Sequence, residues 1–316
     1  MSWLKSAHIL FALCLLMGLL ALAAGSSGWR WTAVAELVRG DDIVAGLRAP
    51  RVVLAALVGA SLALAGVVMQ TLLRNDLADP YILGLSGGAS AGAVSSLALW
   101  PGFPPGPAAA IGAAGAAATV RALTRGSYHP TRLLLAGVTV GSLLASATGL
   151  VLVLAPRATM LRSATFWLFG GLGTPQWNVL AVPAIALASA IGWTLVRAER
   201  LDRLTLGDDV AASLGVDIRP LRRTALLIGV VLTAAAVAVG GLIGFIGLLG
   251  PHIARRLVGA THRRLVPVAV LVGALVVMAA DTAARTAFAP REIPVGLVTA
   301  LFGGPFFLVL LNRRNW

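Results

Sequence analysis

The stretch "RNDLADPYILGLSGGA", residues 74–89, joins two apolar runs and places three charged residues, Arg74, Asp76 and Asp79, within six positions. The rest of the chain is poor in charge. Of its 316 residues, 12% are charged and 58% are hydrophobic, whereas soluble domains are about 25% charged. A soluble chain of this length would need more charge on its surface. We therefore interpret the stretch as a turn between two membrane spans.

Apolar runs recur along the whole chain, and each is long enough to cross a hydrocarbon layer of about 30 Å at 1.5 Å per helical residue. We predict an all-α polytopic membrane protein, with about ten transmembrane helices in a single tightly packed domain over residues 1–316. The seventh and eighth runs join through "VGGLIGFIGLLG", so the sequence leaves their boundary open. The predicted spans are residues 7–24, 51–73, 82–100, 107–123, 131–155, 178–197, 223–242, 243–259, 265–284 and 293–312.

The first span has an alternative interpretation. Lys5, the apolar run and "ALAAG" (21–25) together resemble a secretory signal with an A-x-A cleavage site. The run is long for a signal core, which favours a span. Cleavage would leave nine spans.

The basic residues predict the orientation. Most of the 25 Lys and Arg residues fall in segments that share the side of the N-terminus. Because basic residues gather in cytoplasmic loops, we expect both termini to face the cytoplasm.

Small residues dominate several spans, as in "LVGASLALAG" (57–66) and "AAIGAAGAAATV" (109–120). Gly and Ala allow transmembrane helices to approach closely, which predicts a tight bundle. "LVGA" occurs at 57–60 and again at 271–274. A duplication is one explanation, but the two predicted spans run in opposite directions, so shared packing chemistry is favoured.

The sequence also excludes several kinds of chemistry. Cys14 is the only cysteine, and the four histidines lack metal-ligand spacing, so we expect no metal site and no cofactor. The net charge of +13 lies between the spans, which argues against nucleic acid as a partner. Lys5 is the only lysine and lies outside any phosphate-binding G-x-x-x-x-G-K-[ST] motif. ATP hydrolysis, if it drives this protein, must come from a partner.

Two long segments resemble a known family. These are "RAPRVVLAALVGASLALAGVVMQTLLRNDLADPYILGLSGGA" (48–89) and "GGLIGFIGLLGPHIARRLVGATHRRLVPVAVLVGALVVMAADTAARTAFAPREIPVGLVTALFGGPFFLVLL" (240–311). Both resemble the permease subunits of bacterial ABC importers for iron–siderophores, haem and vitamin B12. The resemblance implies a non-catalytic, ten-helix permease in the lipid of the inner membrane. Its implied partners are a second copy of itself, two cytoplasmic ATPase subunits and a periplasmic binding protein that delivers the cargo.

The turn itself has a physical interpretation. Asn75 and Asp79 are of the type whose side chains accept hydrogen bonds from backbone N–H groups in turns and caps. Pro80 disfavours a helical residue before it. The family usually has proline where this chain has Asp76, so we expect a less rigid turn. A structural hairpin is favoured over direct contact with cargo.

The longest polar segment between spans is "RAERLDRLTLGDDVAASLGVDIRPLRR", residues 197–223. "LGDDVAASLGV" predicts a short amphipathic helix ended by Gly215, followed by extended chain into Pro220. The resemblance implies that this cytoplasmic segment couples to the ATPase; the alternative is a solvated loop. The residues assigned to coupling are Leu206, Gly207, Asp208, Asp209, Ala211, Leu214 and Gly215.

Arginines mark the opposite side. In "LRAPR", Pro50 suits a first helical position, so Arg48 and Arg51 flank a helix start, where each positive charge costs about 0.3–1 kcal/mol. Arg285 lies at the far end of the ninth span, with Asp281 as a possible i,i+4 partner. The resemblance implies that Arg48, Arg51 and Arg285 receive glutamates of the binding protein. Anchoring to lipid phosphates is the alternative.

Three further assignments stay open at this point. His252 could be a haem ligand, but the Pro-His pair belongs to the family pattern whatever the cargo, so we discount it. The resemblance assigns His129, Pro130 and Thr131 to a cytoplasmic gate, although Pro130 departs from the expected small polar residue. An ion-coupled secondary transporter is the rival function. It would need ionisable residues in mid-membrane, and only Asp281 approaches that position.

Overall fold

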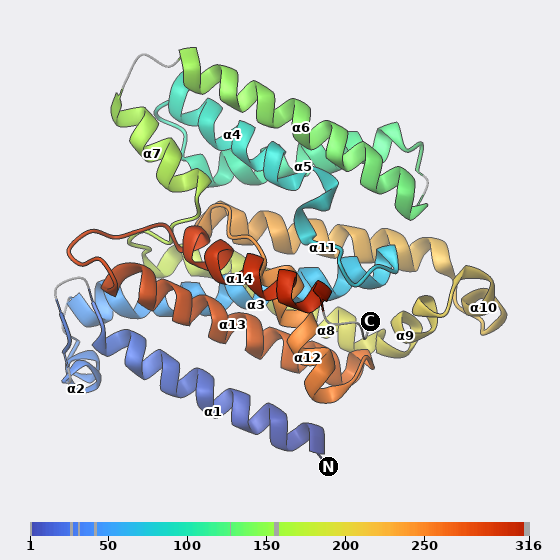
Figure 1. Ribbon diagram of the computed structural model, residues 1–316, viewed down its shortest axis with the longest axis horizontal. Helices are drawn as coiled ribbons and strands as arrows, with labels where there is room; N and C mark the ends of the chain where they lie inside the picture. Colours follow the sequence, from blue (N-terminus) through green and yellow to red (C-terminus); the bar gives the residue numbers. More distant parts are fainter. Residues whose placement is uncertain are drawn as a thin grey trace.

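The computed structural model describes residues 2–25, 28–30, 32–40, 43–126, 128–154 and 158–312, and every regular element in these residues is helical (Figure 1). Three short helices are η1 (Val44–Arg48), η2 (Pro80–Leu83) and η3 (Trp177–Leu180). The α-helices are α1 (Ser2–Ala23), α2 (Ala33–Val38), α3 (Ala49–Leu73), α4 (Leu85–Leu99), α5 (Pro105–Leu123), α6 (Pro130–Leu154), α7 (Ala158–Leu168), α8 (Ala181–Val196), α9 (Ala198–Thr205), α10 (Asp208–Ser213), α11 (Ile218–Gly240), α12 (Ile246–Val258), α13 (His262–Thr286) and α14 (Val295–Asn312).

Each predicted span falls on one helix: α1, α3, α4, α5, α6, α8, α11, α12, α13 and α14 in order. By length and composition, 6 helices among the described residues can cross a membrane. α4 and residues 295–309 of α14 are apolar but shorter, and α12 has only 13 residues against the roughly 20 that a span needs. A helical membrane protein is therefore confirmed, while the count of ten spans stays a prediction.

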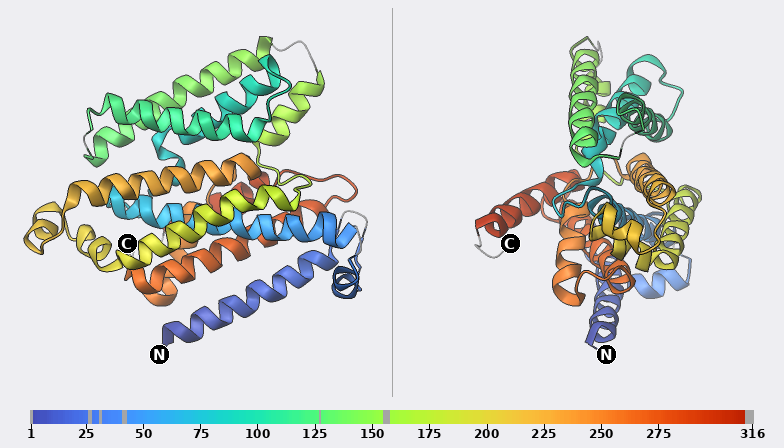
Figure 2. Two further views of the ribbon diagram at one scale, coloured as in Figure 1. Left: turned by 180° about the vertical axis from the view of Figure 1, so that it is seen from behind. Right: turned by 90° about the vertical axis from the view of Figure 1, so that its right-hand side faces the viewer.

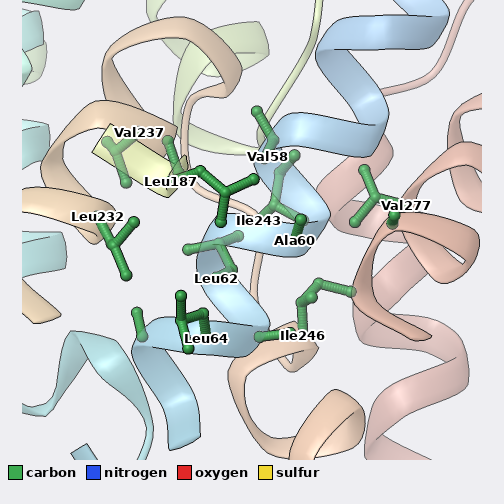
Figure 3. Close-up of a cluster of buried hydrophobic side chains, with 14 of the residues drawn as sticks. Val58, Ala60, Leu62, Leu64, Leu187, Leu232, Val237, Ile243, Ile246 and Val277 are labelled. Carbon is green, nitrogen blue, oxygen red and sulfur yellow. The ribbon is translucent and has the colours of Figure 1, made fainter. Parts of the chain in front are cut away.

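α3 is the central helix of the molecule. Of its 25 residues, 22 are buried, a pattern expected of a helix that other protein segments surround on all sides. Its side chains Val58, Leu62 and Leu64 lie in one cluster with residues of α8, α11, α12 and α13 (Figure 3). Residues 49–73, which belong to the first segment that resembles the family (48–89), thus form the centre of the core.

Glycines allow the helices around α3 to approach closely. A methyl group on Gly59 would overlap the carbonyl oxygen of Gly273, and a methyl group on Gly273 would overlap the carbonyl oxygen of Gly59. The two "LVGA" segments therefore pack against each other, one on α3 and one on α13. The shared sequence is explained by packing chemistry, as predicted.

The helices form two groups (Figures 1 and 2). α4, α5, α6 and α7 form one group, and α3, α8, α11, α12 and α13 form the other, with α1 along its outer edge. α5 packs on α11, where Gly106 contacts the carbonyl of Ala238.

The two ends of the bundle carry different elements. α9 and α10 lie at the same end as the start of α1 and the last described residues of α14, whereas α2 lies at the opposite end (Figure 1). The start of α3 and the end of α13 lie at the α2 end.

The contact between α3 and α13 leads to a stability prediction. Replacing Gly59 with Ala should lower the free energy of unfolding by about 1–3 kcal/mol, because the added methyl group meets backbone that cannot move cheaply. The measurement is the thermal midpoint of the purified chain in detergent, followed by tryptophan fluorescence.

The matched control is Gly149→Ala in α6, where an added methyl group meets nothing within 4 Å. Alanine also has a higher helix propensity than glycine, so this change should leave the midpoint unchanged or raise it. Equal midpoints for the two variants would contradict the packing argument.

Candidate functional site

The α9–α10 end contains the segment assigned to coupling. α10 begins after Gly207, whose φ is 112°, and the chain turns again at Gly215 with φ 77°. A short helix ended by Gly215 is confirmed. The predicted extended chain into Pro220 is wrong, because α11 already begins at Ile218. Proline is tolerated there since N–H groups of a first helical turn have no intrahelical partner.

This segment has a small core of its own. Leu201 and Leu204 of α9 pack with Ala211, Val216 and Leu221, and all five side chains are buried. Sequence reasoning did not identify α9 as a helix. The three-residue spacing of its two buried leucines was the available signal. Because α9 and α10 share a core, they are held together as one unit.

Three large apolar side chains of the segment remain in contact with solvent. Leu206 is 61% exposed, Val210 45% and Leu214 47%, at every fourth position of the sequence. Ala211, assigned to the same role, is instead buried in the small core. Val210 was missed, although the four-residue spacing could have revealed it. The exposed row gives α10 an apolar surface that a partner could cover.

Asp208 ties α10 to two long helices. Its carboxylate lies 2.7 Å from Nη2 of Arg222 in α11 and 3.5 Å from Nη2 of Arg74 at the end of α3. Arg222 is 5% exposed, and its Nη1 lies 3.5 Å from the carbonyl of Tyr128, just before the predicted gate. A movement of α10 would therefore act on α11 and on the segment before α6.

A second connection links α9 to α3 and α13. Oδ1 of Asp202 accepts a hydrogen bond from the backbone N–H of His262 at 2.9 Å and lies 2.6 Å from its Nδ1. Nε2 of His262 lies 2.7 Å from Oγ1 of Thr71, which donates to the carbonyl of Val67. Partial burial raises the pKa of Asp202, but the hydrogen bonds from His262 outweigh it, so the pKa lies below its usual value. The three side chains form a continuous chain between α9 and α3.

The turn after α3 has the local contacts that its residue types predict. Asn75 accepts from the N–H of Leu77, and Asp79 accepts from the N–H of Tyr81. Asp76 lies 3.4 Å from Nη2 of Arg255 in α12, so its carboxylate gives the turn an ion pair to a neighbouring helix.

The predicted gate residues lie at the start of α6. Pro130 is its first residue, a position where the missing N–H is not needed. His129 and Pro130 line a pocket of about 1020 Å³, and Thr131 is exposed beside it. Their role as a gate stays a prediction.

At the opposite end, the three arginines assigned to docking are buried. Arg48 is 6% exposed, Arg51 7% and Arg285 3%. Arg51 already has two anionic partners within the chain, since it lies 3.0 Å from Asp281 and 2.9 Å from Glu292. The expected i,i+4 pair between Arg285 and Asp281 is confirmed at 3.2 Å.

Arg48 and Arg285 both contact the C-terminal end of α1. Arg48 donates to the carbonyls of Leu22 and Ala23, and Arg285 donates to those of Ala21 and Ala24, all at 2.8–3.0 Å. The last four carbonyls of a helix have no intrahelical partner, and its C-terminal end attracts cations. The two guanidinium groups therefore cap the end of α1. Sequence reasoning missed this because α1 is remote in sequence.

The remaining candidates fit structural roles. His252 packs edge-on against Phe306 and Phe307 of α14, with ring centroids 6.1 and 6.3 Å away. Among the described residues, no group of His, Cys, Asp or Glu has the geometry to hold a metal ion. Asp281 is paired with Arg51 and Arg285 at one end of the bundle. These pairs form an internal ion-pair network, which does not favour the ion-coupled transporter.

The fold defined by these long apolar helices is that of an ABC transporter permease, as the comparison with a solved structure shows. A solved structure of an ABC transporter assigned to the metal-chelate type, in an inward-facing conformation, aligns over 99% of this chain and 100% of that chain with a TM-score of 0.87 and 30% identity. PsaBC from Streptococcus pneumoniae shares the fold at a TM-score of 0.57 and 16% identity, with 89% of this chain and 96% of that chain covered.

The model of the FecCD transport family matches residues 13–313, and the chain belongs to this family. The hemin transport system permease protein HmuU of Yersinia pestis is 43% identical over 85% of this chain and 83% of its own length. The cobalamin import system permease protein BtuC of Halobacterium salinarum is 45% identical over 86% and 74%. The Fe(3+) dicitrate transport system permease protein FecD of Escherichia coli is 39% identical over 85% and 84%.

The capping of α1 leads to a prediction. Replacing Arg48 with Met keeps most of the side-chain volume but removes the donor to Leu22 and Ala23, which should destabilise the end of α1 by about 1–3 kcal/mol. Hydrogen–deuterium exchange of the last turn of α1, measured by mass spectrometry, should become faster.

Arg39→Met is the control, because Arg39 is exposed at the end of α2. It removes the same charge at the same end of the bundle and should leave exchange in α1 unchanged. Unchanged exchange in the Arg48 variant would show that the cap contributes nothing.

Proposed function

We propose that this chain is the transmembrane subunit of an ATP-driven importer that carries an iron chelate or a corrinoid across the bacterial inner membrane. It would act as a pair of identical permeases with two cytoplasmic ATPase subunits and a periplasmic binding protein. In this proposal the α9–α10 end faces the cytoplasm and the α2 end faces the periplasm. The chain itself hydrolyses nothing and moves cargo by changing conformation.

The observation that carries the proposal is the exposed apolar row on the coupling segment. Leu206, Val210 and Leu214 are exposed on a unit that has a small core of its own. Two part-buried contacts, from Asp208 to Arg222 and from Asp202 to His262, attach this unit to the long helices. A solvated loop would need neither feature. An ATPase that covers this row could displace α10 and, through Asp208 and Asp202, act on α11, α13 and α3.

The cargo class is supported by the relatives. They are named for hemin, cobalamin and Fe(3+) dicitrate, each of which contains a metal ion. We propose the same class here, with the metal as part of the cargo and not as a resident cofactor. Uptake of radiolabelled haem, ferric siderophore and cobalamin by the assembled transporter in proteoliposomes tests the three members of the class.

Docking of the binding protein at the α2 end remains part of the proposal. Arg48 and Arg285 are occupied by α1, so the side chain best able to exchange partners is Arg51. Its contact to Glu292 is the more open one, since the Glu292 side chain is 32% exposed whereas Asp281 is 1% exposed. A glutamate of the binding protein could replace Glu292 on the same guanidinium group.

The coupling proposal predicts the effect of a charge on α10. Val210→Asp should weaken association with the ATPase by about 2 kcal/mol, roughly thirtyfold, because the carboxylate would be desolvated in the contact. Copurification with the ATPase and ATP-driven uptake in proteoliposomes should both fall.

Val38→Asp is the control, because Val38 is 83% exposed on α2 at the other end of the bundle. Its uptake should equal that of the unmodified transporter. If Val210→Asp copurifies and transports normally, α10 does not contact the ATPase.

The docking proposal predicts opposite effects for two neighbouring changes. Glu292→Gln frees one edge of Arg51 and should tighten binding of the periplasmic protein by up to about fivefold, since a partly exposed ion pair contributes about 0.2–1 kcal/mol. Arg51→Met should weaken it. Affinity is measured by surface plasmon resonance with the permease in nanodiscs.

Glu199→Gln makes the same change on an exposed side chain of α9 and should have no effect. Equal affinity for all three variants would leave the arginines with a structural role alone.

A further inference from the structure

The pocket beside the predicted gate is unusually basic for its size. It has a volume of about 1020 Å³ and lies between the connection from α5 to α6 and the start of α11. Among its described lining residues, Asp208 supplies the one carboxylate. Its arginines are Arg74, Arg121, Arg125, Arg132, Arg219, Arg222 and Arg223. We call this set the arginine pocket.

Two long helices begin at the arginine pocket. α6 starts at Pro130 and α11 at Ile218, and neither has an acidic residue in its first turn. The free N–H groups and the positive end of the dipole at a helix start favour an anion. Both helices place arginines there instead, Arg132 on α6 and Arg219 on α11. The backbone N–H groups and the arginine side chains therefore both attract an anion.

Among the described residues, one donor of Arg222 has no hydrogen-bond partner. Arg222 is 5% exposed, its Nη2 is bound to Asp208, and its Nη1 contacts the carbonyl of Tyr128. Its Nε is buried and has no hydrogen-bond partner. A buried donor left unpaired is unfavourable, and a guanidinium pairs well with the oxygens of a phosphate. Asp208 is already shared between Arg222 and Arg74.

The position of the pocket along the long helices indicates the source of such a phosphate. α5 ends at Leu123, and α6 and α11 start within the pocket lining, so the pocket lies where helices leave the membrane. Leu123 is 62% exposed beside it, and Leu135 and Leu227, further along α6 and α11, are 65% and 58% exposed. Basic pockets between transmembrane helices at this level suit the headgroups of anionic lipids.

We propose that the arginine pocket is a phosphate-binding site that takes the headgroup of an anionic phospholipid. The cytoplasmic leaflet as its source rests on the proposed orientation of the chain. A phosphate there would offset the repulsion among seven guanidinium groups and satisfy Nε of Arg222. Because Arg222 also holds Asp208 of α10 and contacts Tyr128 before the gate residues, the lipid would stabilise the junction between the coupling segment and α6.

The test uses the full-length permease purified in a neutral detergent. Its thermal midpoint is followed by tryptophan fluorescence during titration with phosphatidylglycerol, phosphatidylcholine or inorganic phosphate. The pocket variant is Arg125→Gln combined with Arg219→Gln, because both side chains are exposed and their loss should not prevent folding. The control variant is Arg200→Gln combined with Arg263→Gln, which removes two exposed charges at the same end outside the pocket.

We expect phosphatidylglycerol, and not phosphatidylcholine, to raise the midpoint of the unmodified protein and the control variant. The pocket variant should need about tenfold more phosphatidylglycerol for the same rise. If inorganic phosphate gives the same rise with the same dependence on the pocket variant, the phosphate site stands and its source is soluble.

Equal responses of the pocket and control variants would overturn the proposal. So would a pocket variant with a normal lipid response that no longer copurifies with the ATPase, because the pocket would then be a protein contact. The titration needs no transport activity, so its failure is separate from a failure of the proposed import function.

Discussion

Close contact between helix backbones along α3 is the constraint on which the rest of this structure depends. Lipid tails are as apolar as leucine, so burying more leucine against leucine gains little inside a membrane, and association relies on packing. Gly59 meets Gly273 on α13, and Gly66 meets Gly247 on α12, in both cases backbone to backbone. These contacts explain how neighbouring helices can approach closely around a helix that has 22 of its 25 residues buried.

Polar side chains at both ends of α3 contact the same neighbouring helix, α13. At the first end Arg51 is paired with Asp281 of α13, and at the other Thr71 contacts His262 of α13. Breaking a buried pair by removing one partner is far more costly than the pair's net contribution, so such contacts fix the register between the helices. α3 and α13 are thus held by glycine contacts in the middle and by polar contacts at both ends, which makes them a stiff unit that spans the bundle.

The sequence was sufficient for those features that depend on neighbouring residues. Apolar runs located the long helices, and the residue types of Asn75, Asp79 and Gly215 indicated their local hydrogen bonds and turns. The sequence was insufficient for side chains whose hydrogen-bond partners are remote in the chain. The burial of Arg285 depends on carbonyls of α1 more than 260 positions away, and that of Arg48 depends on the same helix end. α9 was missed for a different reason: half of its eight residues are charged, so the three-residue spacing of Leu201 and Leu204 gave only a weak periodic signal.

The arrangement around α10 determines how a displacement there would spread. Asp202 connects the preceding helix, α9, to α13 and α3, which form the stiff unit, so that attachment resists movement. Asp208 connects α10 to Arg222, which lies near the start of α11 and also contacts the carbonyl of Tyr128. α11 belongs to the group of α3 and packs on α5 of the other group, and the segment after Tyr128 leads into α6 of that other group (Figure 2). A displacement of α10 would therefore turn the segment about the contact between Asp202 and His262. It would move α11 and α6 before it moves α3. The shorter ion pair, at 2.7 Å to Arg222 against 3.5 Å to Arg74, favours the same route.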